Sequence, residues 1–246
     1  RQRQMCIRDR RRIDLKSLNN VRIKNERLLC FYNSIIYNGK VLSNDTYKDE
    51  SKVKYYDVNE LIAAKEGEAP AVTELDIIQK QKINFVLAKD GNVYTLESAD
   101  NGCNIVKIKN DFTLEKVFAN FQPAKGPYHS SPTIGMVASE TENIIYLVST
   151  DGAIYKYILG DSDSLKAPFI AAESGVSITA PLQLNQQSGE LYVTYTEELK
   201  DESKIVVYSK DGKVLHTVDC GESVPSQILF NNLSLIHISE PTRQEA

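Results

Sequence analysis

The sequence is poor in the residues and motifs that most often carry catalysis or bind metals. Its 246 residues include only three histidines and four cysteines. It contains no HExxH, GxSxG or CxxC motif and no glycine-rich phosphate-binding loop, so the common signatures of metal, serine, thiol redox and nucleotide sites are missing. The acidic cluster Asp161-Ser162-Asp163 lacks the glycine and the terminal glutamate of an EF-hand. We therefore expect no catalytic residue, no metal and no cofactor.

Long apolar runs and clusters of basic residues are also missing. No stretch approaches the roughly 18 to 20 apolar residues that a membrane-spanning helix needs. The 33 acidic and 29 basic residues are interspersed, whereas nucleic-acid binding needs lysine and arginine gathered on one surface. We predict neither a transmembrane segment nor a nucleic-acid partner.

The two ends of the sequence resemble translated DNA adapters. Residues 1–10 (RQRQMCIRDR) and 233–243 (LSLIHISEPTR) read, codon by codon, like the two ends of a transposon-type sequencing library. We expect residues 1–10 and 233–246 to be adapter-derived and disordered, and such segments are set aside before fold reasoning. Residues 11–232 would then be an internal fragment, with any signal peptide upstream of it.

The cysteines that remain show no pairing pattern. Setting Cys6 aside with the first segment leaves Cys30, Cys103 and Cys220, which lack the spacing of a zinc or redox site. We expect isolated thiols, and one disulfide stays open as an alternative if the protein is exported.

Most of the sequence has the pattern of an all-β protein. From about Arg27 onward, runs of four to eight residues rich in Val, Ile, Tyr, Phe and Thr alternate with clusters of Gly, Asp, Asn and Ser. One short helix is expected at Asn59–Lys65, capped by Asp57 or Asn59 and ended by Gly67 and Pro70.

The strand runs repeat. Segments beginning at Lys82, Ser131 and Ile178 each contain four β runs, and Tyr94, Tyr146 and Tyr192 take the same place in the second run. Four antiparallel strands recurring every 40 to 50 residues or so are typical of a propeller blade. We predict an all-β fold, a partial β-propeller of about four four-stranded antiparallel blades in an incomplete ring. The expected blades are residues 27–75, 82–121, 131–171 and 178–219, with the next one starting at 225–230.

Three Asp-Gly pairs are evenly spaced but are not one recurring turn. Asp90-Gly91, Asp151-Gly152 and Asp211-Gly212 fall after the first, second and third runs of successive blades. We expect type I′ hairpin turns at all three, because Asp-Gly readily takes two positive φ angles.

The last predicted blade resembles a known group. The strand pair at Leu184–Val193, the run IVVYSKDGK at Ile205–Lys213 and the segment at Gly221–Phe230 are similar to YncE-like propellers, especially surface lipoproteins of Bacteroidetes. The resemblance implies an exported, usually lipid-anchored, non-catalytic binder at the outer-membrane surface or in the periplasm. Relatives of this kind sometimes work beside an outer-membrane transporter, and some capture corrinoids. The irregular first blade, with its helical insertion, departs from the pattern.

The richest candidate site is one loop between blades. Propellers bind ligands on loops, and the loops between blades should share a face with those joining the second and third strands. In the loop FQPAKGPYHSSP (121–132), Phe121, Tyr128, His129 and Ser130 are the predicted ligand-binding residues, suited to a small planar or sugar-like ligand. The alternative is that Tyr128 and His129 only fill the gap between blades.

Three functions stay open at this point. The first is a non-catalytic binding module for a small molecule, such as a corrinoid or a glycan, or for a protein partner such as an outer-membrane transporter. The second is a metal-assisted propeller enzyme, of hydrolase or lyase type, in which carboxylates and His129 converge at the channel mouth. The third is a scaffold for protein–protein contacts.

Overall fold

The computed structural model describes residues 11–13, 20–22, 34–44, 51–65, 70–80, 84–124, 135–197, 202–222, 225, 228 and 230. Both segments predicted to be adapter-derived, and Cys30, lie outside these residues. Strands β1 (Arg11–Ile13) and β2 (Asn20–Arg22) form a separate antiparallel pair.

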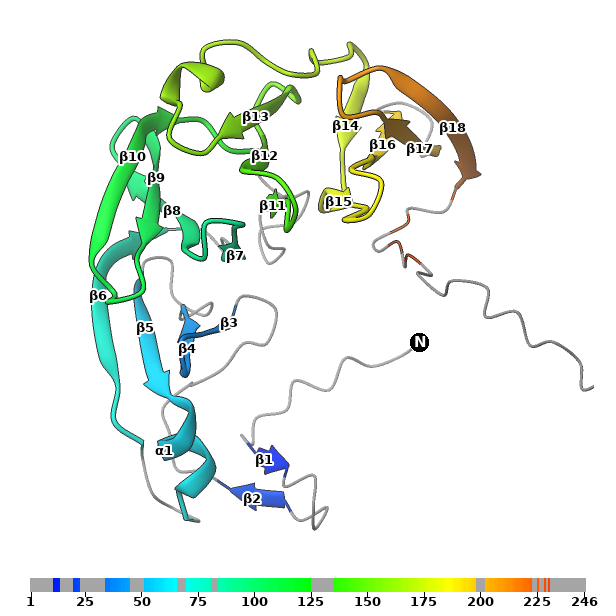
Figure 1. Cartoon of the computed structure of the whole chain (residues 1–246). Helices are drawn as coiled ribbons and strands as arrows, with labels where there is room; N and C mark the ends of the chain where they lie inside the picture. Colours follow the sequence, from blue (N-terminus) through cyan, green and yellow to red (C-terminus); the bar gives the residue numbers. More distant parts are fainter. Residues whose placement is uncertain are drawn as a thin grey trace, which may run out of the picture.

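Four larger antiparallel sheets, the blades of the fold, follow one another around an open arc (Figure 1). Blade one contains β3 (Ile35–Tyr37), β4 (Lys40–Ser43), β5 (Ser51–Asp57) and β6 (Thr73–Gln79); blade two contains β7 (Val86–Leu87), β8 (Val93–Ala99), β9 (Gly102–Ile108) and β10 (Leu114–Phe121). Blade three contains β11 (Met136–Ala138), β12 (Ile144–Val148) and β13 (Ile154–Ile158); blade four contains β14 (Val176–Ile178), β15 (Gln183–Leu184), β16 (Leu191–Glu197), β17 (Ser203–Tyr208) and β18 (Val214–Gly221). The short strands β3, β7, β11 and β15 lie along the inner edge of the arc, which is the arrangement of an incomplete β-propeller.

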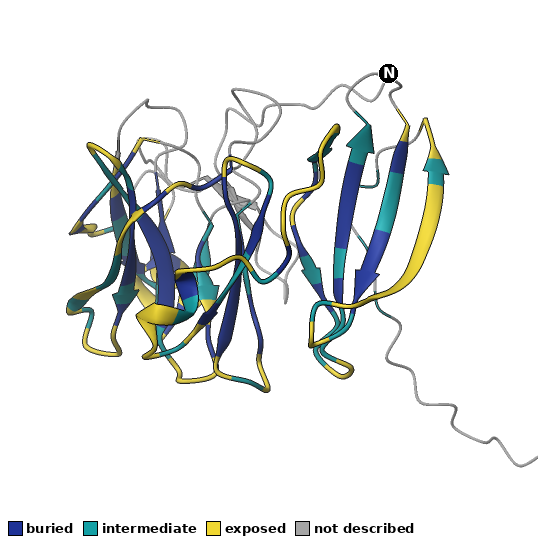
Figure 2. Cartoon of the chain, turned by 90° about the horizontal axis from the view of Figure 1, so that it is seen from above, coloured by how far each residue is buried: buried dark blue, intermediate teal, exposed yellow. Residues whose placement is uncertain are grey.

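Each blade buries its apolar faces against its neighbours. Buried side chains of adjacent blades form one cluster between blades one and two, a second between two and three, and a third between three and four. Figure 2 shows the buried residues along the strands and the exposed residues mainly at the turns and on β18. A single blade could not bury enough surface, so stacking is what stabilises the repeat.

The three aligned tyrosines occupy equivalent places, as predicted. Tyr94, Tyr146 and Tyr192 each lie opposite a residue of the strand at the inner edge. Tyr94 and Tyr146 are only 1% and 2% exposed. Tyr192 is half-buried, and its ring centroid lies 4.9 Å from that of Phe230.

Blade three differs from the four-stranded unit expected for residues 131–171. After β13 the chain turns at Ile158–Asp161 and forms a 3-10 helix, η2 (Ser162–Leu165), before a single bridge joins Ile170 to Ile154. The side chain of Asp161 accepts from the N–H of Asp163, and Ser164 Oγ accepts from the N–H of Ile158. These side chains offer the backbone an alternative to strand pairing, and Pro168 has no N–H to donate.

The predicted helix is present. Helix α1 (Val58–Ala63) is capped by Asp57, whose Oδ1 accepts from the N–H groups of Asn59 at 2.8 Å and Glu60 at 3.1 Å. Leu61 is its buried residue and packs with Tyr56 of β5. The helix therefore decorates the outside of blade one, as expected of an insertion.

The Asp-Gly turns are not of type I′, which corrects the prediction. Gly91, Gly152 and Gly212 have φ angles of 75°, 86° and 77°, but the preceding aspartates are not among the residues with positive φ. In each turn the glycine N–H bonds to the carbonyl three residues earlier, so the loop is a type I turn closed by a left-handed glycine. The turn with two positive φ angles is Asn38-Gly39, at 47° and 72°.

Side-chain amides clasp adjacent blades together. Asn84 Oδ1 accepts from the N–H of Met136 at 3.0 Å, and Asn84 Nδ2 donates to the carbonyl of Met136 at 2.7 Å. Gln186 makes the same kind of double contact with Ala138 and Glu140. These amides satisfy backbone groups at the ends of β11 that the sheet does not pair.

Candidate binding site

On the face predicted for ligand binding, the segment that follows β10 of blade two packs against the β12–β13 turn of blade three. Pro123 bridges to Ser149, the N–H of Ala124 donates to Val148 at 2.8 Å, and the N–H of Thr150 donates to Gln122 at 2.9 Å. Residues 122–124 therefore lie against the β12–β13 turn. The connection between blades and the turn between the second and third strands share one face, as expected.

The structure places one of the four predicted site residues. Phe121 ends β10, is 6% exposed, and meets Tyr155 edge to face at 5.7 Å between ring centroids. Its ring belongs to the core between blades two and three, at the base of the loop, and presents little surface to a ligand. Tyr128, His129 and Ser130 lie outside the described residues, so their binding role stays a prediction.

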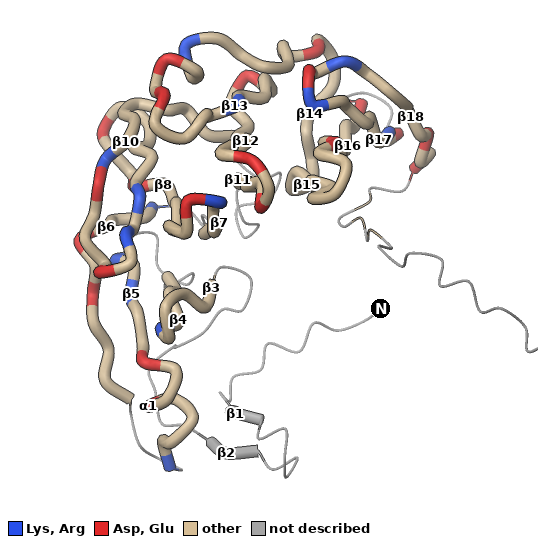
Figure 3. The backbone as a smooth tube through the Cα atoms, viewed as in Figure 1, with Lys and Arg blue, Asp and Glu red and all other residues tan. Residues whose placement is uncertain are grey.

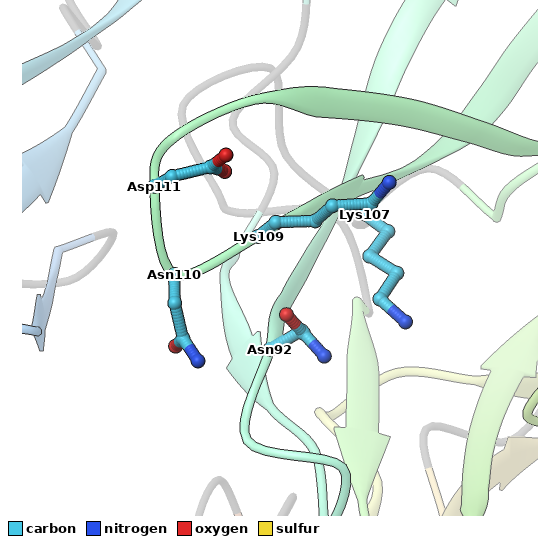
Figure 4. Close-up of a pocket in the computed structure, with 5 residues that line it drawn as sticks. All are labelled: Asn92, Lys107, Lys109, Asn110 and Asp111. Carbon is cyan, nitrogen blue, oxygen red and sulfur yellow. The ribbon is translucent and has the colours of Figure 1, made fainter.

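A cavity that is widely open to solvent lies at the opposite end of blade two. It has a volume of about 420 Å³ and is lined by Asn92, Lys107, Lys109, Asn110 and Asp111 (Figure 4). These residues come from the start of β8, the end of β9 and the β9–β10 turn. Sequence reasoning missed this site. The sequence feature that could have indicated it is the pair Lys107 and Lys109, which lie two residues apart on one face of a strand and close to two turns.

The carboxylate of Asp90 holds Lys107, one of the lining residues, in place. Its Oδ2 lies 2.9 Å from Lys107 Nζ and accepts from the Tyr94 hydroxyl at 2.8 Å. Burial alone would raise the pKa of Asp90, but the hydrogen bonds from Lys107, Tyr94 and Asn92 outweigh it and lower that pKa. Burial, and then the hydrogen bond to Asp90, raise the pKa of Tyr94.

Lys109 and Asp111, two other lining residues, make more exposed contacts. Lys109 Nζ lies 2.9 Å from Glu115 Oε2, and both side chains are almost half exposed. Asp111 Oδ1 accepts from the N–H of Thr113 at 3.0 Å and from its hydroxyl at 2.6 Å, and these bonds lower the pKa of Asp111. The cavity thus offers ammonium, amide and carboxylate groups held in place by the turn, which suits hydrogen bonding to a polar ligand.

Charge is mixed over the rest of the molecule. Figure 3 shows Lys and Arg intermingled with Asp and Glu along the strands and turns. Within the described residues, no group of three or more His, Cys, Asp or Glu could hold a metal ion. No helix in the described part of the chain is long and apolar enough to cross a membrane.

The two described cysteines are free thiols. Cys103 is buried, and burial raises its pKa to about 11, with Glu97 adding to the shift. Cys220 is partly exposed on β18.

Comparison with known sequences identifies a family. A family model described as "Domain of unknown function (DUF5074)" matches residues 43–231. No curated protein sequence matches the chain.

Three solved structures illustrate the structural similarity. Puromycin hydrolase has a TM-score of 0.50 at 13% identity, covering 76% of this chain and 28% of its own. TolB from Acinetobacter baumannii has 0.49 at 10% identity, covering 74% and 42%, and virginiamycin B lyase from Staphylococcus aureus has 0.43 at 12%, covering 85% and 61%. The chain therefore spans less than two thirds of each of these proteins, and at 13% identity the similarity to puromycin hydrolase speaks for the fold alone.

Proposed function

We propose that this chain, which belongs to the family described as "Domain of unknown function (DUF5074)", is a non-catalytic binding module of the propeller class. Its place is the bacterial cell surface or the periplasm, because the blade-four pattern resembles YncE-like surface proteins. The observation that carries the proposal is the docked loop face, where residues 122–124 are hydrogen-bonded to the β12–β13 turn of the next blade. A rigid sheet scaffold with loops fixed at their base is a common way to present a binding surface.

The ligand in this proposal is a small planar or sugar-like molecule, a corrinoid or a glycan. Tyr128, His129 and Ser130 contact it from the loop between blades two and three, while Phe121 anchors the base of that loop in the core. An aromatic ring beside an imidazole and a hydroxyl supplies both stacking and hydrogen bonds. A protein partner such as an outer-membrane transporter would receive the ligand from the same face.

Calorimetric titration of the chain with cyanocobalamin and with a panel of neutral oligosaccharides tests this function. We expect one ligand class to bind, and Tyr128→Ala and His129→Ala each to weaken binding about tenfold or more. His216→Ala is the matched control, because His216 is exposed on β18 in blade four. Equal ligand affinity in all three variants would show that the binding site is not in this loop.

The enzyme alternative has a separate readout. Incubation with ester, amide and lactone substrates should give no turnover above the rate in buffer. Product release that disappears in His129→Ala would overturn the non-catalytic proposal.

A further inference from the structure

The same position in the third strand of three blades has a different environment in each. Tyr55, Lys107 and Lys156 lie opposite Leu42, Tyr94 and Tyr146, the second-strand residues that face the next blade. Side chains directly opposite on antiparallel strands share a face of the sheet. All three therefore point into the groove between their own blade and the next.

Protein groups cover this position in the first and third grooves. Phe112, in the β9–β10 turn of blade two, stacks on Tyr55 with ring centroids 4.6 Å apart. The backbone oxygen of Lys210, in the β17–β18 turn of blade four, accepts from Lys156 Nζ at 3.2 Å. The turn between the third and fourth strands of each following blade thus closes the groove.

The second groove is different. Lys107 is paired inside its own blade, with Asp90 at 2.9 Å, and its side chain lines the cavity of about 420 Å³. The five lining residues all belong to blade two. In the equivalent turn of blade three, Ile158–Asp161, Leu159 packs against the apolar cluster between blades two and three. Lys107 therefore borders this cavity, whereas Tyr55 and Lys156 are each contacted by a turn of the following blade.

The charges around this space restrict what can enter it. Lys107 and Lys109 bring two positive charges, and Asp90, Glu115 and Asp111 bring three negative ones. An anionic ligand would lie beside Asp111, and a cationic ligand would lie beside the two lysines. A neutral hydroxyl group avoids both charge repulsions, because it can donate a hydrogen bond to a carboxylate and accept one from an ammonium group.

We infer that the cavity of blade two is a binding site for a neutral, hydroxyl-rich ligand of the pyranoside class. Hydroxyl groups of the ligand would contact the Asp111 carboxylate and the Lys109 ammonium group, and both residues line the cavity (Figure 4). The exposed Lys109–Glu115 pair is readily exchanged for ligand contacts, since exposed ion pairs contribute little. This site lies at the other end of the blade from the Tyr128–Ser130 loop and does not depend on the proposed function.

Three sugars of one shape and different charge test the inference. Glucose, glucuronate and glucosamine are titrated into the ¹⁵N-labelled chain at constant ionic strength, and amide chemical shifts are followed. We expect glucose to shift the amides of residues 92 and 107–111, with the two charged sugars about fivefold weaker. Glucuronate or glucosamine binding as well as glucose would overturn the ligand class, and no shift with any sugar would overturn the site.

Two variants and a matched control complete the test. Lys109→Ala and Asp111→Asn should each weaken glucose binding about tenfold, and Asp111→Asn keeps the side-chain oxygen that caps the turn at Thr113. Asp211→Asn, in the equivalent turn of blade four, should leave binding unchanged. Melting curves confirm that each variant is folded. If Tyr128→Ala and His129→Ala abolish corrinoid or glycan binding at the loop face, they should still leave this site intact.

Discussion

Phe112 stacks on Tyr55 with a ring-centroid distance of 4.6 Å and an interplanar angle of 27°, although its backbone has a φ of 64°. Bulky side chains rarely adopt this left-handed conformation. In the equivalent turn of blade four the same place is held by Gly212, with a φ of 77°. The backbone strain at Phe112 therefore accompanies an aromatic contact that closes the groove between blades one and two.

This balance predicts an unusual order of stability. Phe112→Ala loses the stacking but keeps the strain, whereas Phe112→Gly loses the stacking and removes the strain. Both variants should be less stable than the parent, and the glycine variant should be more stable than the alanine variant by about 1 kcal/mol in urea denaturation.

Lys210 supplies the control for this prediction. It lies in the corresponding turn of blade four and is not among the residues with positive φ. There the order should reverse, with Lys210→Gly less stable than Lys210→Ala. An alanine variant at 112 as stable as the glycine variant would contradict the strain argument.

Gly102 is a second place where the backbone needs glycine. Its φ is 122°, and an added Cβ would lie 2.6 Å from the carbonyl oxygen of Phe121. Gly102→Ala should therefore lower the free energy of unfolding by about 3 kcal/mol. Gly152→Ala is the control, because its φ is 86° but nothing lies within 4 Å of the added atom. It should cost about 1 kcal/mol, and equal losses at both positions would refute the steric part of the argument.

The blade pattern could be predicted because it depends on local features. Apolar runs, turn residues and the three aligned tyrosines each follow from side-chain chemistry within a few residues. Phe121 was harder to interpret, because Gln122 and Pro123 after it are typical of a loop. Only the packing against Tyr155 of the next blade shows that its ring is buried.

Other features depend on contacts that the sequence does not display. The repeat predicts a fourth strand within residues 131–171, but hydrogen bonds of Asp161 and Ser164 to the backbone stabilise η2 (Ser162–Leu165) after β13 instead. The cavity of blade two is lined by residues from the start of β8 and from the end of β9 with its following turn, which come together only in the folded sheet. The sequence around Lys107 and Lys109 does not show which groups of the neighbouring blade lie close to them.

Asn84 provides a test of how the blades are held together. Asn84→Ala removes both partners of the Met136 backbone, whose N–H and carbonyl would lose bonds of 3.0 and 2.7 Å. Unfolding should become easier by about 2 kcal/mol. Hydrogen exchange at the Met136 amide should accelerate more than at residues of blade one, because the loss is confined to the contact between blades two and three. Uniform acceleration along the chain would show that Asn84 has no special role there.

Asp90 predicts how stability depends on pH. Burial works against its ionised form, yet the hydrogen bonds from Lys107, Tyr94 and Asn92 prevail, so its folded-state pKa is lower than in the unfolded chain. A carboxylate with a lowered pKa contributes stability above its unfolded pKa, near 3.8, and loses it as pH falls through the folded value. Asp90→Asn should therefore cost about 1 to 2 kcal/mol at pH 7.

That difference between the parent and Asp90→Asn should shrink steadily as the pH falls below about 4, because Asp90 then binds a proton more readily in the unfolded parent than in the folded parent. Urea denaturation at pH 7, 5, 4 and 3 measures it. Asp211→Asn serves as the comparison at pH 7, since Asp211 lies in an exposed turn of blade four and its replacement there should cost little. A cost of Asp90→Asn that stays constant down to pH 3 would show that the loss comes from altered shape or packing, not from the charge that Lys107 and Tyr94 stabilise.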